Sequence, residues 1–344
     1  MKVGEWVEVR SKEEILRTLD EKGELDSMPF MPEMFAYCGK RFQIHKSAHK
    51  TCDTVFPIRA RRVDRAVHLA TRCDGQAHGG CQAGCLIFWK EAWLKRVDQV
   101  VPNGAATPSP SHSSHAKTAC TESDVQASTQ RPNPDGGAPT YVCQATRLPY
   151  FTRDLEWWEL RQYVQDYLSG NVGLRRVLDG LLYASYYNLS EMRGLARLPM
   201  RWLYDRLSPL WGGPRYPRSP GTLRAGSPTP TASLDLQPGE WVRVKPHEQI
   251  LQTITTDNRN RGLLWDAEMV PYCGGTYRVL KRVTRILDEK TGTMLEMKTP
   301  CIVLDAVVCQ ARYSACRMFC PRSIYPYWRE AWLERIDPTA AGER

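Results

Sequence analysis

The sequence predicts an α+β protein built from two tandem copies of one small module. Each module is expected to be an SH3-like, partly open β-barrel closed by a C-terminal helix, with a helical insert between the copies. Three observations lead to this fold class. The two ends of the chain repeat one another. Short stretches within each repeat alternate apolar and polar residues, as half-buried strands do. The segment between the repeats follows a helical period of 3.6 residues.

The repeat is defined by motifs that return along the chain in the same order. The first two matches are shifted by 235 positions and the third by 239, so the second copy carries a short insertion after its last cysteine. Matching on this scale indicates an internal duplication. The matched pairs are Gly4–Val7 with Gly239–Val242, Tyr37–Gly39 with Tyr272–Gly274, and Trp89–Leu94 with Trp328–Leu333.

The first half of each module predicts a strand, a short helix and a second strand. Residues 4–10 alternate apolar and polar side chains and predict the first strand. Ser11 and Glu14 have the spacing of a capping box, so a short amphipathic helix is expected to follow. The proline-containing stretch 29–42 resembles the approach to a strand in SH3-like barrels, and residues 41–44 predict that strand.

The second half of each module predicts one more strand and the closing helix. Residues 67–69 predict the strand. The helix is expected to hold Cys85, Trp89 and Trp93, because residues four apart lie on one helical face. The tryptophans would then cover the last cysteine and exclude water, and packing in the core explains them equally well.

Five segments are expected along the chain. The modules occupy 1–98 and 236–338. A flexible Ser/Pro/Gly linker over 99–150 and a Pro/Arg-rich linker over 213–235 are predicted from composition and from the lack of hydrophobic periodicity. The segment 151–212 between these linkers carries apolar stripes that predict three helices.

Four cysteines at matched places in each copy are the main candidate site. Their spacing is C-x34-C-x7-C-x3-C in the first copy and C-x35-C-x6-C-x3-C in the second. Four thiolates satisfy either a tetrahedral zinc ion or the corners of an iron–sulfur cluster, so about one metal centre per module is predicted. The predicted ligands are Cys38, Cys73, Cys81 and Cys85 in the first copy, and Cys273, Cys309, Cys316 and Cys320 in the second.

The identity of the metal stays open between two candidates. Structural zinc sites usually include a C-x2-C pair, which neither copy contains. Cys320-Pro321 resembles the Cys-Pro that closes a bacterial ferredoxin motif, so an iron–sulfur cluster is slightly preferred over Zn²⁺. Inert buried thiols, and disulfides or redox switching, are the alternatives to metal binding.

A secondary group occurs in the first copy alone. His45, His49 and Cys52 form an H-x3-H-x2-C pattern, and His78 lies just before Cys81. Such residues could form a mononuclear metal site or supply a general base, and a solvated basic segment is the preferred alternative. The asymmetry suggests that one copy is the working site and the other a structural partner.

The composition and charge of the chain predict a cellular compartment and a class of partner. The start of the chain has no apolar segment of a secretory signal, and no apolar run is long enough for a membrane helix, so a cytoplasmic, reducing location is expected. The net charge of +9 suits nucleic acid or a membrane surface, but no motif supports either. Another protein is therefore the expected partner.

Two classes of function follow from these observations. In the first, the protein is an accessory redox, electron-transfer or modification protein with two four-cysteine metal sites. In the second, it is a non-catalytic scaffold or interaction protein with structural zinc sites, because small modules often need a metal to hold them together. Whether the protein is an enzyme stays open, since familiar catalytic motifs such as G-x-S-x-G and H-E-x-x-H are missing.

Overall fold

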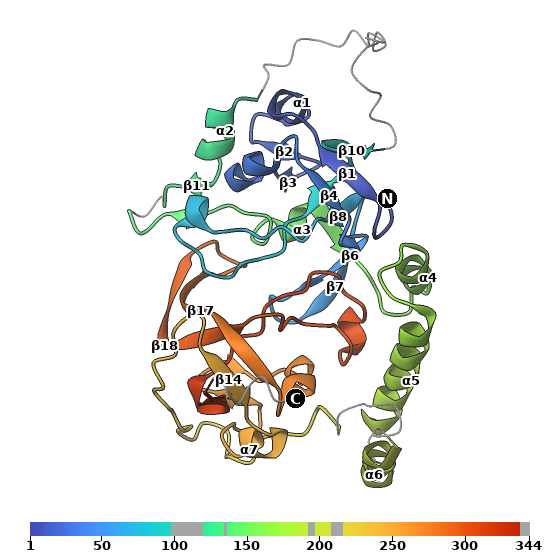
Figure 1. Ribbon diagram of the computed structural model, residues 1–344, viewed down its shortest axis with the longest axis vertical. Coiled ribbons are helices and arrows are strands. Elements are labelled where there is room, and N and C mark those ends of the chain that lie inside the picture. Colours follow the sequence, from blue (N-terminus) through green and yellow to red (C-terminus); the bar gives the residue numbers. More distant parts are fainter. Residues whose placement is uncertain (98–119, 134–135, 192–196, 208–215, 338–344) are drawn as a thin grey trace. The chain divides into compact units, whose positions relative to one another are not determined.

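The fold mixes helices and strands, and its strands form small antiparallel sheets (Figure 1). The computed structural model describes residues 1–97, 120–133, 136–191, 197–207 and 216–337. The chain forms two compact units. Unit 1 contains residues 1–173 and 285–295, and unit 2 contains residues 174–284 and those from 296 onward. The α+β class predicted from the sequence is confirmed.

Unit 1 begins with a three-stranded antiparallel sheet. Its central strand, β1 (Trp6–Val9), lies between β4 (Arg41–Gln43) and β10 (Leu94–Arg96). Val7 and Val9 of β1 are fully buried, whereas Trp6 is exposed, so the strand presents one face to the core. The alternating pattern of the sequence predicts this strand correctly.

A capping box starts the first helix, as the sequence predicts. The Ser11 hydroxyl accepts the N–H of Glu14 at 3.3 Å, and the Glu14 carboxylate accepts the N–H of Ser11 at 3.0 Å. The helix, α1 (Lys12–Leu16), is short and buries Ile15. The other elements of unit 1 are β2 (Glu24–Leu25), β3 (Met28–Pro29), η1 (Pro32–Tyr37), β5 (Lys46–Ser47), β6 (Lys50–Asp53), β7 (Arg59–Val63), β8 (Ala66–His68), η2 (Gln76–His78), β9 (Trp89–Lys90), η3 (Glu91–Trp93), α2 (Glu122–Ala127), β11 (Gln130–Arg131), β12 (Thr140–Tyr141), α3 (Leu148–Phe151), β13 (Thr152–Asp154) and α4 (Arg161–Leu168).

The predicted closing helix is wrong in both modules. In unit 1 the segment forms β9, the single 3-10 turn η3 and then β10. Trp89 and Trp93 are nonetheless fully buried, and the ring of Phe30 meets both edge to face. Two tryptophans four residues apart match a helical face, but here a strand and a turn bring both indoles into the same core. Cys85 lies in the loop before β9, so it does not share a helix with them.

Residues 120–150 differ from the flexible linker predicted for 99–150. They form α2, β11, β12 and α3, while 98–119 lie outside the described residues. The amide of Gln144 is buried and bridges two segments: its Nε2 donates to the Phe88 carbonyl and its Oε1 accepts the Phe88 N–H. These segments are polar between a few apolar anchors, so their composition resembles that of a linker. The anchors that enter the core of unit 1 are Cys120, Val125, Cys143, Leu148 and Phe151.

Unit 2 holds most of a sheet in which β14 (Trp241–Val244) lies between β17 (Thr276–Leu287) and β19 (Leu333–Arg335), with β18 (Met294–Leu304) at the edge beyond β17. Residues 285–287 of β17 and 294–295 of β18 belong to unit 1. Within this four-stranded sheet, the strands β17, β14 and β19 repeat the order and the register of β4, β1 and β10 in unit 1. Val242 faces Tyr277 as Val7 faces Phe42, and Val244 faces Leu333 as Val9 faces Leu94. The other short elements of unit 2 are α7 (His247–Leu251), β15 (Arg259–Asn260), β16 (Leu263–Leu264), η6 (Ala267–Tyr272), η7 (Ala315–Arg317) and η8 (Glu330–Trp332).

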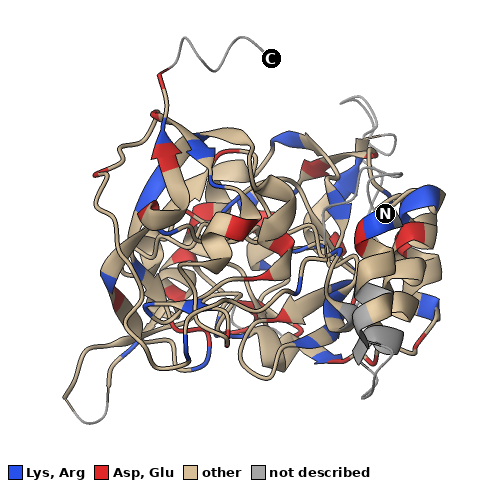
Figure 2. Ribbon diagram, turned by 90° about the horizontal axis from the view of Figure 1, so that it is seen from below, with Lys and Arg blue, Asp and Glu red and all other residues tan. Residues whose placement is uncertain are grey.

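The helical segment is divided between the two units. Helix α4 belongs to unit 1, whereas α5 (Leu174–Glu191) and α6 (Arg197–Leu207) belong to unit 2. A cluster of tyrosines, including Tyr183, Tyr204 and Tyr313, packs α5 and α6 into unit 2. No helix in the part of the chain that the structure describes has the length and hydropathy to cross a membrane. Basic and acidic residues are interspersed in the view of Figure 2, without a separate basic stripe.

The same hydrogen bond anchors a buried tryptophan in each unit, and it yields a prediction of stability. Trp93 Nε1 donates to Thr18 Oγ1 at 3.1 Å, and Trp332 Nε1 donates to Thr253 Oγ1 at 2.9 Å. Thr18→Val and Thr253→Val should each lower the free energy of unfolding by about 1–3 kcal/mol, because each leaves an indole N–H without an acceptor. Denaturant titration checks this. Thr18→Ser and Thr253→Ser keep the hydroxyl, and valine variants as stable as the serine variants would contradict the prediction.

Candidate functional site

A closed loop over residues 73–85, here called the Cys73 loop, presents the candidate site. Backbone pairing ties its two ends together. Arg72 pairs with Leu86 in an antiparallel bridge, and the N–H of Cys73 donates to the carbonyl of Cys85 at 2.9 Å. Backbone pairing therefore holds the two ends of this loop together within unit 1.

Gly75 sets the path of the chain inside this loop. Its φ of +75° is left-handed, and a Cβ built on it would lie 1.9 Å from the Cys81 carbonyl oxygen, so only glycine fits. The Gly75 carbonyl accepts the N–H groups of His78 and Gly80. The 3-10 turn η2 that starts here ends on His78, whose side chain is thereby carried into the protein interior.

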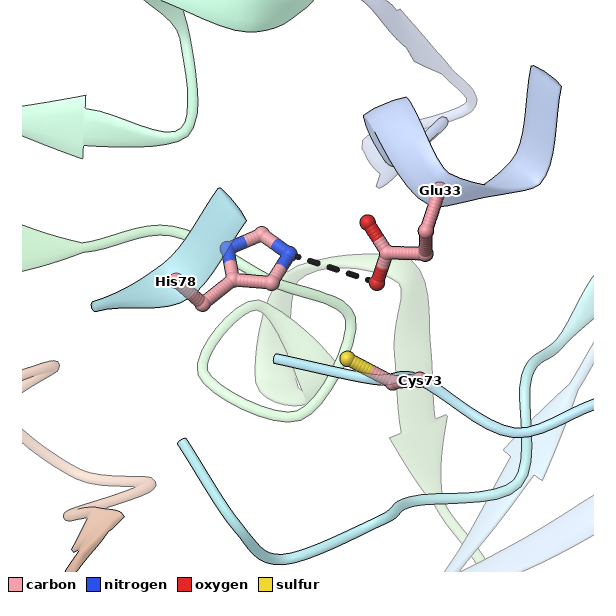
Figure 3. Close-up of side chains that lie close together, drawn as sticks. All are labelled: Glu33, Cys73 and His78. Carbon is pink, nitrogen blue, oxygen red and sulfur yellow. Dashed lines mark ion pairs between the residues drawn. The ribbon is translucent and has the colours of Figure 1, made fainter. Parts of the chain in front are cut away.

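Three different ligand types meet where the Cys73 loop contacts η1. Glu33 lies in the first turn of η1, and its carboxylate points at the His78 ring (Figure 3). Glu33 Oε1 and His78 Nε2 are 3.5 Å apart. One ligand atom from each of Glu33, Cys73 and His78 lies within 4.8 Å of the other two. The carboxylate, thiol and imidazole thus converge from two segments that are far apart in the sequence.

Burial leaves the polar atoms of this group without hydrogen bonds. The His78 side chain is 1% exposed and that of Glu33 is 8% exposed. Both carboxylate oxygens of Glu33 and both ring nitrogens of His78 are buried and make no hydrogen bond. Each unsatisfied buried polar group costs about 1–3 kcal/mol, so four such atoms at one place need an explanation.

The electrostatics of the group favour a cation. Burial raises the pKa of the Cys73 thiol well above its ordinary value, and the Glu33 carboxylate raises it further, followed by the thiols of Cys85 and Cys143. Burial also acts to raise the pKa of Glu33, but His78, with smaller contributions from Cys73 and from the backbone of Glu33, lowers the pKa overall. The lowered pKa of Glu33 favours its carboxylate form, whereas the raised pKa of Cys73 disfavours its thiolate. A bound divalent cation would stabilise both anions at once.

The donor set suits zinc-class metals. Zinc takes sulfur from cysteine, nitrogen from histidine and oxygen from carboxylates, commonly in four-coordinate sites. Three such donors are present here, and a fourth position would fall to water or to another side chain. The other thiols that affect the pKa of Cys73 are those of Cys85 and Cys143.

The predicted four-cysteine set of the first module is not gathered at this place. Glu33, Cys73 and His78 form the one group of three or more Cys, His, Asp and Glu ligands within 4.8 Å among the described residues. Of the four predicted cysteines, it includes Cys73 alone. Cys38 ends η1, where burial raises the pKa of its thiol and Lys12 lowers it. Cys81 Sγ instead accepts the N–H of Leu287 at 3.4 Å.

The second module uses the corresponding glutamate differently. Glu268 lies on η6 at the position of Glu33, shifted by 235 residues. Its Oε2 accepts the N–H of Arg312 at 2.9 Å and its Oε1 accepts the N–H of Tyr313 at 2.5 Å. Burial raises the pKa of Glu268. Backbone donors thus satisfy this carboxylate, in contrast to that of Glu33.

The four cysteines of the second module also stay apart as ligands. In the described residues, none of them belongs to a group of three ligand atoms within 4.8 Å. Burial raises the pKa of Cys273 to about 12. Cys309 donates its N–H to the Ile324 carbonyl, Cys316 is exposed with its Sγ 3.2 Å from the Ser314 hydroxyl, and Cys320 is buried.

The secondary group predicted in the first module separates into different environments. His49 Nε2 lies 3.1 Å from Asp166 Oδ1 on α4, and Lys50 Nζ lies 2.5 Å from Asp166 Oδ2. Burial lowers the pKa of His45, and Cys52 is buried in β6. A solvated basic segment was the preferred alternative here; His45 is exposed and Lys46 half-buried, but Lys50 is 2% exposed and is not solvated. The ion pair of Lys50 with Asp166 joins β6 to α4 within unit 1.

His78, a secondary candidate in the sequence, belongs to the candidate ligand group of the structure, and Glu33 was not among the residues that the sequence predicted. Glu33 is visible in the sequence as part of Glu33-Met34, which returns as Glu268-Met269. A carboxylate repeated at the same place in both copies could have been weighed as a ligand. The chain matches no protein-family model and no curated protein. The geometry of the site therefore carries the functional argument alone.

The tight turn at Gly75 gives a test of the loop. Gly75→Ala should lower the free energy of unfolding by about 3 kcal/mol or more, because it adds a steric clash to the left-handed backbone. Gly39→Ala is the matched control. Gly39 has a φ of +72° with nothing within 4 Å of a built Cβ, so it should cost only about 1–2 kcal/mol. Equal losses in denaturant titrations would show that the close approach to Cys81 is not rigid.

The buried pair of Lys50 and Asp166 gives a second test. Asp166→Ala should lower the free energy of unfolding by about 3–5 kcal/mol, because it leaves a buried ammonium without its carboxylate. Lys50→Met combined with Asp166→Ala should cost less than the sum of the two single changes. A double-mutant cycle from denaturant titrations measures the coupling, and strict additivity would contradict it.

Proposed function

We propose that this chain is a metal-binding protein whose first module holds one zinc-class divalent ion between η1 and the Cys73 loop. The Glu33 carboxylate, the Cys73 thiolate and the His78 imidazole are its ligands. One observation carries the proposal: three ligand types converge within 4.8 Å while the polar atoms of Glu33 and His78 are buried without hydrogen bonds. Metal binding would release the Cys73 proton and give a partner to the Glu33 carboxylate and to one ring nitrogen of His78.

A structural role for the ion is favoured over a catalytic one. Catalytic zinc keeps a position open to substrate, whereas the Glu33 and His78 side chains are almost fully buried. An ion here would join a turn near the N-terminus to a loop that follows β8. This supports the scaffold or interaction class of function, with another protein as the partner. A small module gains stability from such a cross-link.

We also infer that the two modules are tandem SH3-like copies that have diverged at the metal site. The matched order and register of β4-β1-β10 and β17-β14-β19 support a common origin. In the second module, two backbone N–H groups donate hydrogen bonds to the Glu268 carboxylate. The proposal therefore assigns one ion per chain, in place of one per module.

Metal content of matched variants tests the proposal. Elemental analysis of the full chain should give about one zinc per chain, since three donors of this kind make a zinc-class site. Glu33→Gln and Cys73→Ser should lose most of that zinc. Glu268→Gln and Cys309→Ser change the corresponding residues of the second module and should retain it. Circular dichroism of each variant shows whether the fold persists.

The alternatives give different results in the same experiment. A brown protein containing iron and sulfide would support iron–sulfur clusters and contradict the proposal. Zinc loss in Cys309→Ser as large as in Cys73→Ser would favour two four-cysteine sites. A chain without bound metal that also takes up no added Zn²⁺ or Co²⁺ would reject metal binding at this group.

Metal removal gives an independent prediction. A chelator should lower the thermal unfolding midpoint of the wild-type chain, because the ion binds the folded state alone. The same chelator should leave the midpoint of Cys73→Ser almost unchanged. Differential scanning calorimetry measures both. A wild-type midpoint that does not respond to the chelator, in protein shown to contain zinc, would contradict a structural role.

A further inference from the structure

A pocket of about 240 Å³ lies wholly within unit 2, apart from the candidate metal site. Its walls come from residues 230–233, from β18 at 298–300 and from residues 329–331. Three basic side chains and a single acidic one line it. These charged residues are Arg282, Lys298, Arg329 and Glu330.

The acidic residue of the pocket, Glu330, already has hydrogen-bond donors and a cationic partner within unit 2. The Glu330 carboxylate accepts the N–H groups of Leu234 and Leu236, each at 3.0 Å. Arg282 Nη1 donates to the same carboxylate at 2.8 Å. Glu330 therefore compensates the charge of Arg282, and the charges of Lys298 and Arg329 remain.

Arg329 is buried without a carboxylate partner. It is 7% exposed, and its guanidinium donates to the carbonyl oxygens of Thr299 and Arg261. Its Nε is buried and makes no hydrogen bond. Burial lowers the pKa of Arg329. Among the residues that the structure describes, neither Arg329 nor the exposed Lys298 makes an ion pair with an acidic group.

The first module has a carboxylate beside the corresponding basic residue, and the second module does not. Lys90 stands where the second module has Arg329, and Lys90 Nζ donates to Asp26 Oδ2 at 3.0 Å. The position of Asp26 is taken by Arg261 in the second module. Both residues have a left-handed backbone, with φ of 51° and 45°, so the local turn is the same. A carboxylate that neutralises the cation in one module has become a second cation in the other.

We propose that this pocket binds a compact oxyanion, the phosphate or carboxylate group of a small metabolite, through Arg329 and Lys298. The Nη groups of Arg329 already donate to backbone carbonyls and to Cys301 Sγ, so Arg329 offers such a group its Nε–H and its charge. Hydroxyls of Thr231 and Ser233 line the same space. The volume is below the range of about 300–1,000 Å³ typical for drug-sized ligands, so the ligand is small. A bound oxyanion replaces the charge that Asp26 provides in the first module.

Binding of inorganic phosphate and of succinate to the full chain, measured by isothermal titration calorimetry at low salt, tests this proposal. The two probes distinguish a phosphate from a carboxylate ligand. The wild-type chain should bind at least one of them with a stoichiometry of about one. Lys298→Gln should weaken that binding about tenfold or more, because it removes a charge-assisted contact. Arg224→Gln removes an exposed charge elsewhere in unit 2 and should leave it unchanged.

Arg261→Asp is the sharpest variant, because it restores the carboxylate found in the first module and does not remove a buried side chain. It should weaken oxyanion binding about tenfold or more and raise the thermal unfolding midpoint. Failure of both probes to bind the folded wild-type chain would overturn the proposal. So would wild-type affinity in both Lys298→Gln and Arg261→Asp, or an equal loss in Arg224→Gln. None of these results depends on the metal content of the first module.

Discussion

Glu33 is carried into the interior of unit 1 by the same kind of 3-10 turn that carries Glu268 into unit 2. A carboxylate in such a place needs hydrogen-bond donors or a cation, since desolvation of a charge is costly. In unit 2 two backbone N–H groups fulfil this need. In unit 1 the loop places Cys73 and His78 there instead, and neither gives Glu33 a hydrogen bond of good geometry. This difference is the basis of the proposed metal site.

The loop that creates the difference depends on backbone geometry as much as on its ligands. The left-handed turn at Gly75 and the backbone pairing of Cys73 with Cys85 hold η2 in place. Those constraints direct the His78 side chain inward. Cys81 and Cys85 then belong to the frame of the loop, and Cys73 is the cysteine whose thiol joins the ligand group.

Sequence patterns predicted the local structure well where one physical signal dominated. The capping box of Ser11 and Glu14 and the alternation around Val7 and Val9 correctly gave α1 and β1. The closing helix failed because the spacing of Trp89 and Trp93 fits a helix as well as a strand followed by a turn. The cysteine spacing singled out Cys73 as a candidate ligand, and it did not indicate that Glu33 and His78 lie beside it. Which donors meet depends on tertiary contacts between η1 and the loop, and spacing carries no information on those.

Comparison of the two modules shows how one framework supports different chemistry. Strand order and the buried tryptophans with their threonine acceptors are kept. The charges beside them are exchanged, as Asp26 in the first module is replaced by Arg261 in the second. In unit 1 the buried polar atoms of Glu33 and His78 make no hydrogen bond, and in unit 2 the buried Arg329 has no carboxylate partner among the described residues. Uncompensated buried groups of this kind are where ligands are expected.

X-ray absorption spectroscopy of the zinc-loaded full chain is the sharpest test of the proposed Glu33, Cys73 and His78 site, because it reports the atoms bound to the metal. We expect zinc to be coordinated by sulfur at about 2.3 Å together with nitrogen and oxygen at about 2.0–2.2 Å. The sulfur contribution should fall in Cys73→Ser and stay unchanged in Cys309→Ser. A shell of four sulfurs, or a spectrum altered equally by both substitutions, would contradict a site built on Glu33, Cys73 and His78.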